Sequence, residues 1–170
     1  MEYKSFLRPG KGATDISPLL GNAVAFVDLI NDLIGLFDNL KVDKVACIEG
    51  RGFLLGAPVA FGLKAGLVPI RSPGKLKNQI YSETFIDYSG KEKTLEIHQD
   101  AISVGERIVI VDDWVETGAT IKAAIKLIEK CGGKVVGVAA FMDDSNDELK
   151  EELKKYNYNY IEKVRKGDKY

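Results

Sequence analysis

A short apolar run that ends in two adjacent acidic residues restricts this chain more than any other feature. Residues 108–111 are Ile-Val-Ile-Val, and Asp112 and Asp113 follow directly. A run of β-branched apolar residues is typical of a strand that is buried on both faces of a parallel sheet. We expect the strand to end at the acids, which places both carboxylates at the edge of the sheet where ligands bind in α/β proteins.

The next residues predict an anion-binding turn at the start of a helix. This turn contains Thr117, Gly118, Ala119 and Thr120. Backbone N–H groups at a helix start have no intrahelical partner, and the helix dipole attracts an anion to them. The threonine hydroxyls add donors, and Gly118 lets a phosphate approach the backbone closely. Because Asp112 and Asp113 lie just upstream and can accept hydrogen bonds from vicinal hydroxyls, the combination suits a ribose 5-phosphate.

Predicted strands and helices alternate along the rest of the chain. Apolar spacing predicts helices at about 17–39, 53–64 and 120–128, and buried strands at 44–48, 67–70 and 135–141. This alternation predicts a single α/β domain with a central parallel sheet and helices on both faces. Residues 80–88 and 94–97 instead have the pattern of a hairpin that turns at Ser89-Gly90. That hairpin is either a mobile lid over the site or an ordinary surface hairpin.

The composition excludes several classes of function. The 170-residue chain has 45% hydrophobic and 29% charged residues and a net charge of −1. These values are typical of a soluble globular domain and provide no basic field for nucleic acid. No apolar run approaches the roughly 18 residues of a membrane-spanning helix, and the N-terminus lacks the apolar core of a signal peptide. We therefore expect a cytoplasmic protein that binds neither nucleic acid nor membranes.

Five segments occur in an order that is found in a known family. They are PGKGATDISPLL, EGRGFLLGAP, IRSPGKL, LEIHQDAI and VIVDDWVETGAT. The last segment closely resembles the signature by which type I phosphoribosyltransferases bind 5-phosphoribosyl 1-pyrophosphate (PRPP). Within that family, the ordered set resembles the adenine phosphoribosyltransferases most closely.

The resemblance implies both an architecture and a reaction. It implies one phosphoribosyltransferase domain over residues 1–170, with a small hood on the base side formed by residues 1–16 and 141–170 and a flexible lid formed by residues 72–97. In the implied reaction, a purine base displaces pyrophosphate from PRPP, with adenine as the expected base and AMP as the product. The implied cofactor is Mg²⁺, bound through substrate and water. Asp112 and Asp113 would act mainly on the ribose hydroxyls or on metal-bound water, with direct binding of the metal as the alternative, and the implied assembly is a homodimer.

The resemblance also assigns the pyrophosphate contacts and the catalytic acid. Arg51, Arg71 and Lys75 match family positions that contact pyrophosphate, and the loop that carries the last two could reach across a dimer interface. Asp87 is the nearest match to the catalytic acid of the lid, although Glu83 is a competitor.

Glu116 departs from the adenine enzymes, which commonly have alanine at this position. An acid there resembles the 6-oxopurine phosphoribosyltransferases, in which it faces N7 of the purine and exchanges a proton with it. Glu116 could act in this way, or it could be an acid that favours the dipole at a helix N-terminus. Both interpretations remain open.

The predicted base-binding residues depart from the family as well. Adenine enzymes have an aromatic residue and an arginine where this chain has Ala13 and Thr14, so the stacking surface is lost while backbone contacts from Gly12 and Thr14 remain. Asp144 could accept hydrogen bonds from the exocyclic amine of the base, but we prefer to place it at the start of the last helix. The alternatives are therefore a 6-oxopurine enzyme and a PRPP-binding regulator without turnover.

Overall fold

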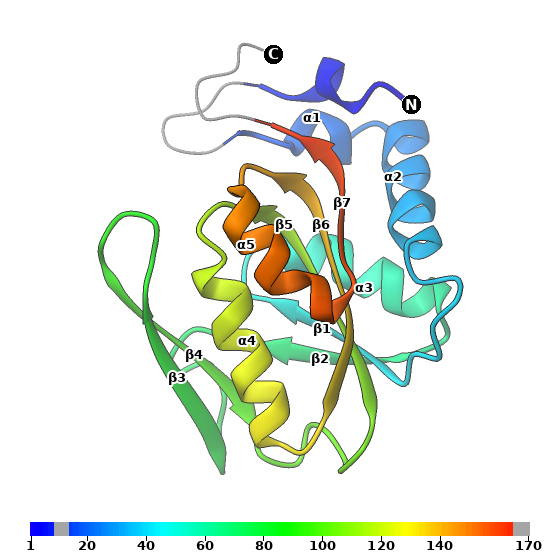
Figure 1. Ribbon diagram of the computed structural model, residues 1–170. Helices are drawn as coiled ribbons and strands as arrows, with labels where there is room; N and C mark the ends of the chain where they lie inside the picture. The colour runs from blue at the N-terminus through cyan, green and yellow to red at the C-terminus, as the bar shows by residue number, and fades with distance from the viewer. Residues whose placement is uncertain (9–13, 165–170) are drawn as a thin grey trace.

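A five-stranded parallel sheet forms the centre of the protein (Figure 1). The computed structural model describes residues 1–8 and 14–164. The strand order is β2-β1-β5-β6-β7. The strands are β1 (Lys44–Ile48), β2 (Gly66–Ile70), β5 (Arg107–Val115), β6 (Lys134–Asp143) and β7 (Tyr158–Lys163). The α/β fold with a central parallel sheet, which the sequence predicted, is confirmed.

Helices cover both faces of this sheet. The longer ones are α2 (Ala23–Gly35), α3 (Arg51–Gly62) and α4 (Ala119–Lys130), and the shorter ones are α1 (Ser17–Leu20) and α5 (Asp147–Leu153). Helices α2 and α3 share one apolar cluster with Val45 and Val109, whereas α4 shares the other with Ala46 and Ile110. Because alternate residues of a strand point to opposite faces, one sheet contributes to both clusters.

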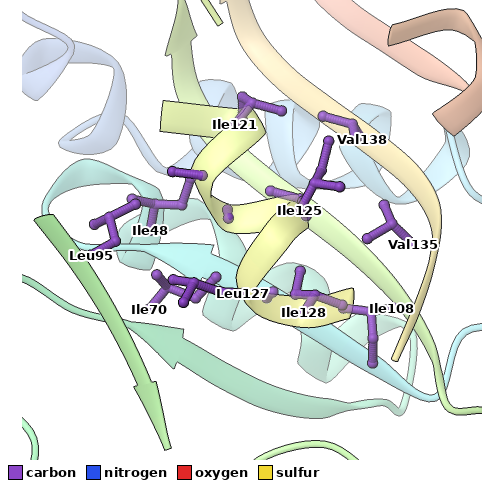
Figure 2. Packing of buried hydrophobic residues seen from close by; sticks show 14 of the residues in the cluster. Ile48, Ile70, Leu95, Ile108, Ile121, Ile125, Leu127, Ile128, Val135 and Val138 are labelled. Atoms are coloured by element: carbon purple, nitrogen blue, oxygen red, sulfur yellow. The ribbon is translucent and has the colours of Figure 1, made fainter. Parts of the chain in front are cut away.

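Helix α4 packs on its face of the sheet through a continuous apolar stripe. Figure 2 shows Ile121, Ile125 and Ile128 of α4 near Ile108 of β5 and Val138 of β6. All five side chains are buried. Each buried side chain of this size contributes roughly 1.5–3 kcal/mol relative to an exposed one, so the stripe fixes the start of α4 against the sheet.

A hairpin of strands β3 (Ile80–Ile86) and β4 (Glu92–His98) lies beside α4 rather than in the central sheet (Figure 1). Its antiparallel register runs from Ile80–His98 to Ile86–Glu92. The hairpin predicted around Ser89-Gly90 is therefore confirmed.

The first predicted helix is divided in the structure. Apolar spacing predicted one helix from residue 17 to about residue 39, but α1 ends at Leu20 and α2 starts at Ala23. The side chain of Asn22 accepts a hydrogen bond from the Ala25 backbone N–H at 3.0 Å. This N-cap satisfies a backbone donor that a new helix leaves free, and it explains the break.

In the part of the chain that the structure describes, no helix combines the length and the apolar character that crossing a membrane requires.

The contact between α3 and β1 depends on a residue without a side chain. A Cβ atom added to Gly56 of α3 would collide with Cys47 Cβ of β1. We expect Gly56→Ala to lower the free energy of unfolding by about 1–3 kcal/mol because the packed core must shift. Gly35→Ala is the control, since its Cβ would meet no atom closer than 4.0 Å. Urea unfolding measures both, and equal stabilities of the two variants would contradict the prediction.

Candidate functional site

The sheet has a topological switch point between β1 and β5. The connection from β1 through α3 leads outward to β2, whereas the connection from β5 through α4 leads the other way to β6. The two helices therefore cover opposite faces, and a crevice opens between the carboxyl ends of these strands. The last residue pair between β1 and β5 is Cys47–Val111, but β5 remains paired with β6 as far as Val115–Asp143.

Asp112 and Asp113 lie in the part of β5 that extends beyond β1. The prediction that the strand ends at these acids was wrong, because pairing with β6 carries the strand on to Val115. Both acids are nonetheless beside the crevice, and they are only 7% and 8% exposed. Asp112 Oδ1 accepts a hydrogen bond from the Asp113 backbone N–H at 2.9 Å.

Arg51, the first residue of α3, places a positive charge at this crevice. Its Nη2 lies 2.7 Å from Asp113 Oδ2, and its Nη1 donates to the Thr14 carbonyl oxygen at 2.6 Å. Gly52 allows this close approach, since a Cβ there would lie 2.8 Å from Asp112 Oδ1. The start of α3 thus packs directly on the acidic pair.

The electrostatics of the pair follow from its burial. Burial, and then the neighbouring Asp113 carboxylate, raise the pKa of Asp112 well above its ordinary value. Burial also raises the pKa of Asp113, although the Arg51 guanidinium acts in the opposite direction. Two adjacent buried carboxylates therefore favour a ligand that donates hydrogen bonds or carries positive charge.

The turn after β5 has the geometry that an anion needs. Gly118 is the N-cap of α4 and has a φ of 70°, a left-handed conformation that glycine adopts without a steric penalty. Ala119 and Thr120 begin the helix, so their backbone N–H groups point out of its N-terminal end. The Thr117 hydroxyl lies 3.4 Å from the Ala119 nitrogen.

Asp113, the turn and Arg51 line one pocket of about 190 Å³. The hairpin contributes Tyr88 to its wall. The lining residues are Arg51, Tyr88, Asp113, Trp114, Val115, Glu116, Thr117, Gly118, Thr120 and Ile121. Glu116, for which two roles were predicted, therefore lies at the pocket.

The other predicted pyrophosphate residues, Arg71 and Lys75, follow β2 and lie outside this lining. Arg71 Nη2 is 3.1 Å from Glu49 Oε1, and the Ser72 backbone N–H donates to the same carboxylate at 2.5 Å. Hydrogen bonding from Arg71 and Ser72 lowers the pKa of Glu49. Lys75 is exposed. Glu49 and Arg71 together fix the beginning of this loop.

Sequence reasoning missed the part that Glu96 plays in this loop. Glu96 is a buried acid of β4, and its Oε2 accepts a hydrogen bond from the Gly74 backbone N–H at 3.1 Å. The backbones of Glu96 and Arg71 also exchange two hydrogen bonds, at 2.7 and 2.9 Å. The signal was available, since Glu96 lies in the family-like segment LEIHQDAI.

Asp87 lies at the end of the hairpin, where its carboxylate organises the turn. Its Oδ1 accepts hydrogen bonds from the Ser89 backbone N–H, the Ser89 hydroxyl and the Lys91 backbone N–H, at 2.8, 2.7 and 3.1 Å. Hydrogen bonding, chiefly from the Ser89 hydroxyl, lowers the pKa of Asp87. The competitor Glu83 forms an ion pair with Lys126 of α4 at 2.7 Å. In this conformation neither acid lines the pocket.

The predicted base-binding residues are only partly described. Gly12 and Ala13 lie outside the described residues. Thr14 is buried, and its carbonyl oxygen is bound by Arg51. Asp144 follows β6, and its backbone N–H donates to the Val115 carbonyl oxygen at 2.8 Å. Asn146, rather than Asp144, caps the last helix through its bond to the Leu149 nitrogen.

The donor set fits a cation that binds mainly through substrate and water. Within residues 1–8 and 14–164, no cluster of three or more His, Cys, Asp or Glu side chains is arranged to hold a metal ion. Asp112 and Asp113 nonetheless provide two adjacent carboxylates at the crevice. This arrangement suits Mg²⁺, which keeps several waters and often binds through one or two carboxylates and substrate phosphates.

The chain is similar to known proteins over most of its length. Residues 20–168 match the model of the phosphoribosyl transferase domain. The adenine phosphoribosyltransferase of Leuconostoc citreum is 44% identical over 140 residues, which cover 82% of this chain and 79% of that protein. The enzyme of the same name from Thermotoga petrophila is 42% identical over 165 residues, or 92% of this chain and 96% of that protein. The crystal structure of adenine phosphoribosyltransferase from Thermoanaerobacter pseudethanolicus has a TM-score of 0.86 at 38% identity, covering 96% of this chain and 98% of that chain.

The raised pKa of Asp112 predicts a pH-dependent effect of Asp112→Asn on stability. The folded protein holds the Asp112 proton more tightly than the unfolded chain does. The contribution of this group to stability is therefore complete below the ordinary pKa of about 4 and is lost as the pH rises through the folded-state pKa. We expect Asp112→Asn to gain stability relative to the unsubstituted protein between pH 4 and pH 7.

Urea unfolding at both pH values measures this effect. Asp38→Asn, at an exposed position after α2, is the control and should stay within about 0.5 kcal/mol of the unsubstituted protein. If the stability of Asp112→Asn relative to the unsubstituted protein falls between pH 4 and pH 7, burial of the ionised Asp112 does not destabilise the fold and the prediction is wrong.

Proposed function

Since this chain belongs to the phosphoribosyl transferase family, we propose that it transfers the phosphoribosyl group of PRPP to adenine, giving AMP and pyrophosphate in purine salvage. The chain is an enzyme of the pentosyltransferase class, as its adenine phosphoribosyltransferase relatives are. The observation that carries the proposal is the pocket in which the Thr117–Thr120 turn lies beside the buried acids. Relatives at 42–44% identity that share this activity support the choice of adenine.

The PRPP donor is proposed to bind along the end of β5. The 5-phosphate would accept hydrogen bonds from the backbone N–H groups and hydroxyls of the Thr117–Thr120 turn, where the helix dipole adds to the attraction. Asp112 and Asp113 would accept hydrogen bonds from the ribose hydroxyls. In the sequence the acids precede the turn, just as the hydroxyl-bearing carbons of ribose precede the carbon that carries the 5-phosphate.

The pyrophosphate is proposed to leave towards Arg51 and the loop after β2. Negative charge accumulates on the leaving group as the bond from C1 of the ribose breaks, so cations there lower the barrier. Arg51 already lies at the pocket, with Asp113 as its partner. Mg²⁺, the usual companion of PRPP in this family, would be held by Asp112 and Asp113 together with the substrate, and it would neutralise phosphate charge.

A homodimer is proposed to complete this part of the site. Lys75 is exposed and does not line the pocket of its own chain. A lysine at that position could serve the neighbouring subunit instead. Residues 1–16 and 141–170 are proposed to form a hood on the base side, and residues 72–97 a lid. Tyr88, which lines the pocket, supports the proposed lid.

The acceptor base must lose a proton as its nitrogen bonds to C1, and Glu116 is the proposed proton acceptor. Glu116 lines the pocket, whereas Asp87 Oδ1 accepts three hydrogen bonds within the hairpin turn. Thr14 is proposed to contact the base through its backbone, together with Gly12 and Ala13. Asp144, whose backbone N–H donates to the Val115 carbonyl oxygen, is the proposed partner of the exocyclic amine.

The position of Glu116 at the pocket also favours a second class of acceptor, the 6-oxopurines. An acid at position 116 of the pocket resembles the 6-oxopurine enzymes, and it would suit a base whose N7 carries a proton. The choice between the two acceptor classes depends on which base the pocket satisfies with hydrogen bonds, because an unpaired buried polar group costs about 1–3 kcal/mol.

Steady-state kinetics with PRPP, Mg²⁺ and each purine tests the proposal. We expect kcat/KM for adenine to exceed that for hypoxanthine, guanine or xanthine by at least about 100-fold, since two mismatched hydrogen bonds have this effect. Turnover of a 6-oxopurine without turnover of adenine would make the second class correct. PRPP binding without turnover of any base would indicate a regulator and would contradict the proposal.

A further inference from the structure

Asp143, the last residue of β6, is a buried carboxylate that the proposed reaction does not use. It is 0% exposed. Its Oδ1 accepts hydrogen bonds from the Ser145 hydroxyl at 2.5 Å and the Tyr158 hydroxyl at 2.7 Å. Lys150 Nζ lies 2.9 Å from its Oδ2. A buried charge is costly unless such partners surround it, so its presence calls for a physical reason.

The partners of Asp143 come from three successive parts of the chain. Ser145 belongs to the loop after β6, Lys150 to α5, and Tyr158 to β7. The Lys150 ammonium also lies 5.3 Å from the centre of the Tyr160 ring. Burial, and then the bond to Asp143, raise the pKa of Tyr158, which therefore stays protonated and donates. One carboxylate thus fixes α5 and its preceding loop to the end of the sheet.

The segment held in this way forms a wall behind the phosphate turn. The Asp144 backbone N–H donates to the Val115 carbonyl oxygen at 2.8 Å. Leu149 of α5 packs on Gly118 so closely that a Cβ there would lie 2.6 Å from both leucine methyl carbons. Val115 and Gly118 both line the pocket. The Asp143 cluster therefore contacts α5 and its preceding loop, and these in turn contact the residues proposed to bind the 5-phosphate.

We propose that Asp143 is a positioning residue for the 5-phosphate of PRPP, acting through α5 and the Asp144–Val115 hydrogen bond on the turn that begins α4. The proposal rests on the proposed function for the identity of the ligand. Weakening the Asp143 cluster loosens Leu149 against Gly118 and spreads the backbone N–H groups that face the phosphate. The acids and Arg51 are held by β5 and α3, so ribose and pyrophosphate contacts stay in place.

A pair of tyrosine variants tests this role. Tyr158→Phe removes one hydrogen bond to Asp143, whereas Tyr156→Phe removes the same hydroxyl from a bond to Glu129, at 3.3 Å on the exposed side of α4. We expect Tyr158→Phe to raise KM for PRPP about threefold to tenfold, part of the effect of losing one charge-assisted hydrogen bond. kcat should change less than about twofold, and Tyr156→Phe should change neither KM for PRPP nor kcat. Asp143→Asn should follow Tyr158→Phe with a larger effect.

Two measurements that need no turnover separate this proposal from the proposed function. Amide hydrogen exchange at Asp144 should be at least about tenfold faster in Tyr158→Phe, because the Asp144–Val115 bond opens more often. Affinity for ribose 5-phosphate, measured by calorimetry, should fall with the same variant. If the unsubstituted protein turns over no base, the proposed function fails while these two comparisons still decide the role of Asp143.

Three results would overturn the positioning role. Unchanged KM for PRPP in Tyr158→Phe would show that the cluster does not reach the phosphate turn. An equal rise in KM for PRPP in Tyr156→Phe would show that the effect does not depend on the Asp143 cluster. Unchanged exchange at Asp144 and unchanged ribose 5-phosphate affinity would contradict the proposed path of contacts.

Discussion

The 2.7 Å ion pair between Arg51 and Asp113 connects the start of α3 to the middle strand of the sheet. Two adjacent acids are buried in that strand, and their mutual repulsion would be costly without a cation nearby. The cation comes from α3 because β5 extends past the end of β1, which leaves room for the first turn of this helix. Gly52 then allows the helix to approach Asp112 without a steric clash. Arg51 therefore neutralises the negative charge of the two carboxylates only in part. A ligand with hydroxyl groups, or a metal ion, would stabilise these carboxylates further.

The local features of the fold could be predicted from the sequence, because each depends on residues that are close together in the chain. The apolar run at 108–111 predicted the buried strand, and Gly118 with its threonines predicted the turn before α4. The extension of β5 beyond the acids could not be predicted, because it depends on pairing with β6, a separate part of the chain. The break before α2 did have a local signal in Asn22, but the apolar spacing continues across it and concealed the cap.

The residues of the candidate site could be predicted in the same way, but most of their contacts could not. The acidic pair, the phosphate turn, Arg51 and Glu116 were predicted from one motif or from segments in a familiar order. In the structure Arg51, Asp113, Glu116 and the turn line one pocket, and Asp112 is buried next to Asp113. The hydrogen bond from Arg51 to Thr14 and the cluster around Asp143 join segments that are separate in the sequence. Composition and residue spacing therefore could not predict them. The hairpin turn is intermediate: its position was predicted, but the hydrogen bonds that engage Asp87 within it were not.

The acids of β5 and the turn before α4 are proposed to form one site for ribose 5-phosphate, and a crystal structure of the protein with AMP bound would test this proposal. We expect the 5′-phosphate within hydrogen-bond distance of the Thr117–Thr120 backbone N–H groups, with the ribose hydroxyls at Asp112 and Asp113. A phosphate bound elsewhere, or a ribose that contacts neither acid, would contradict it.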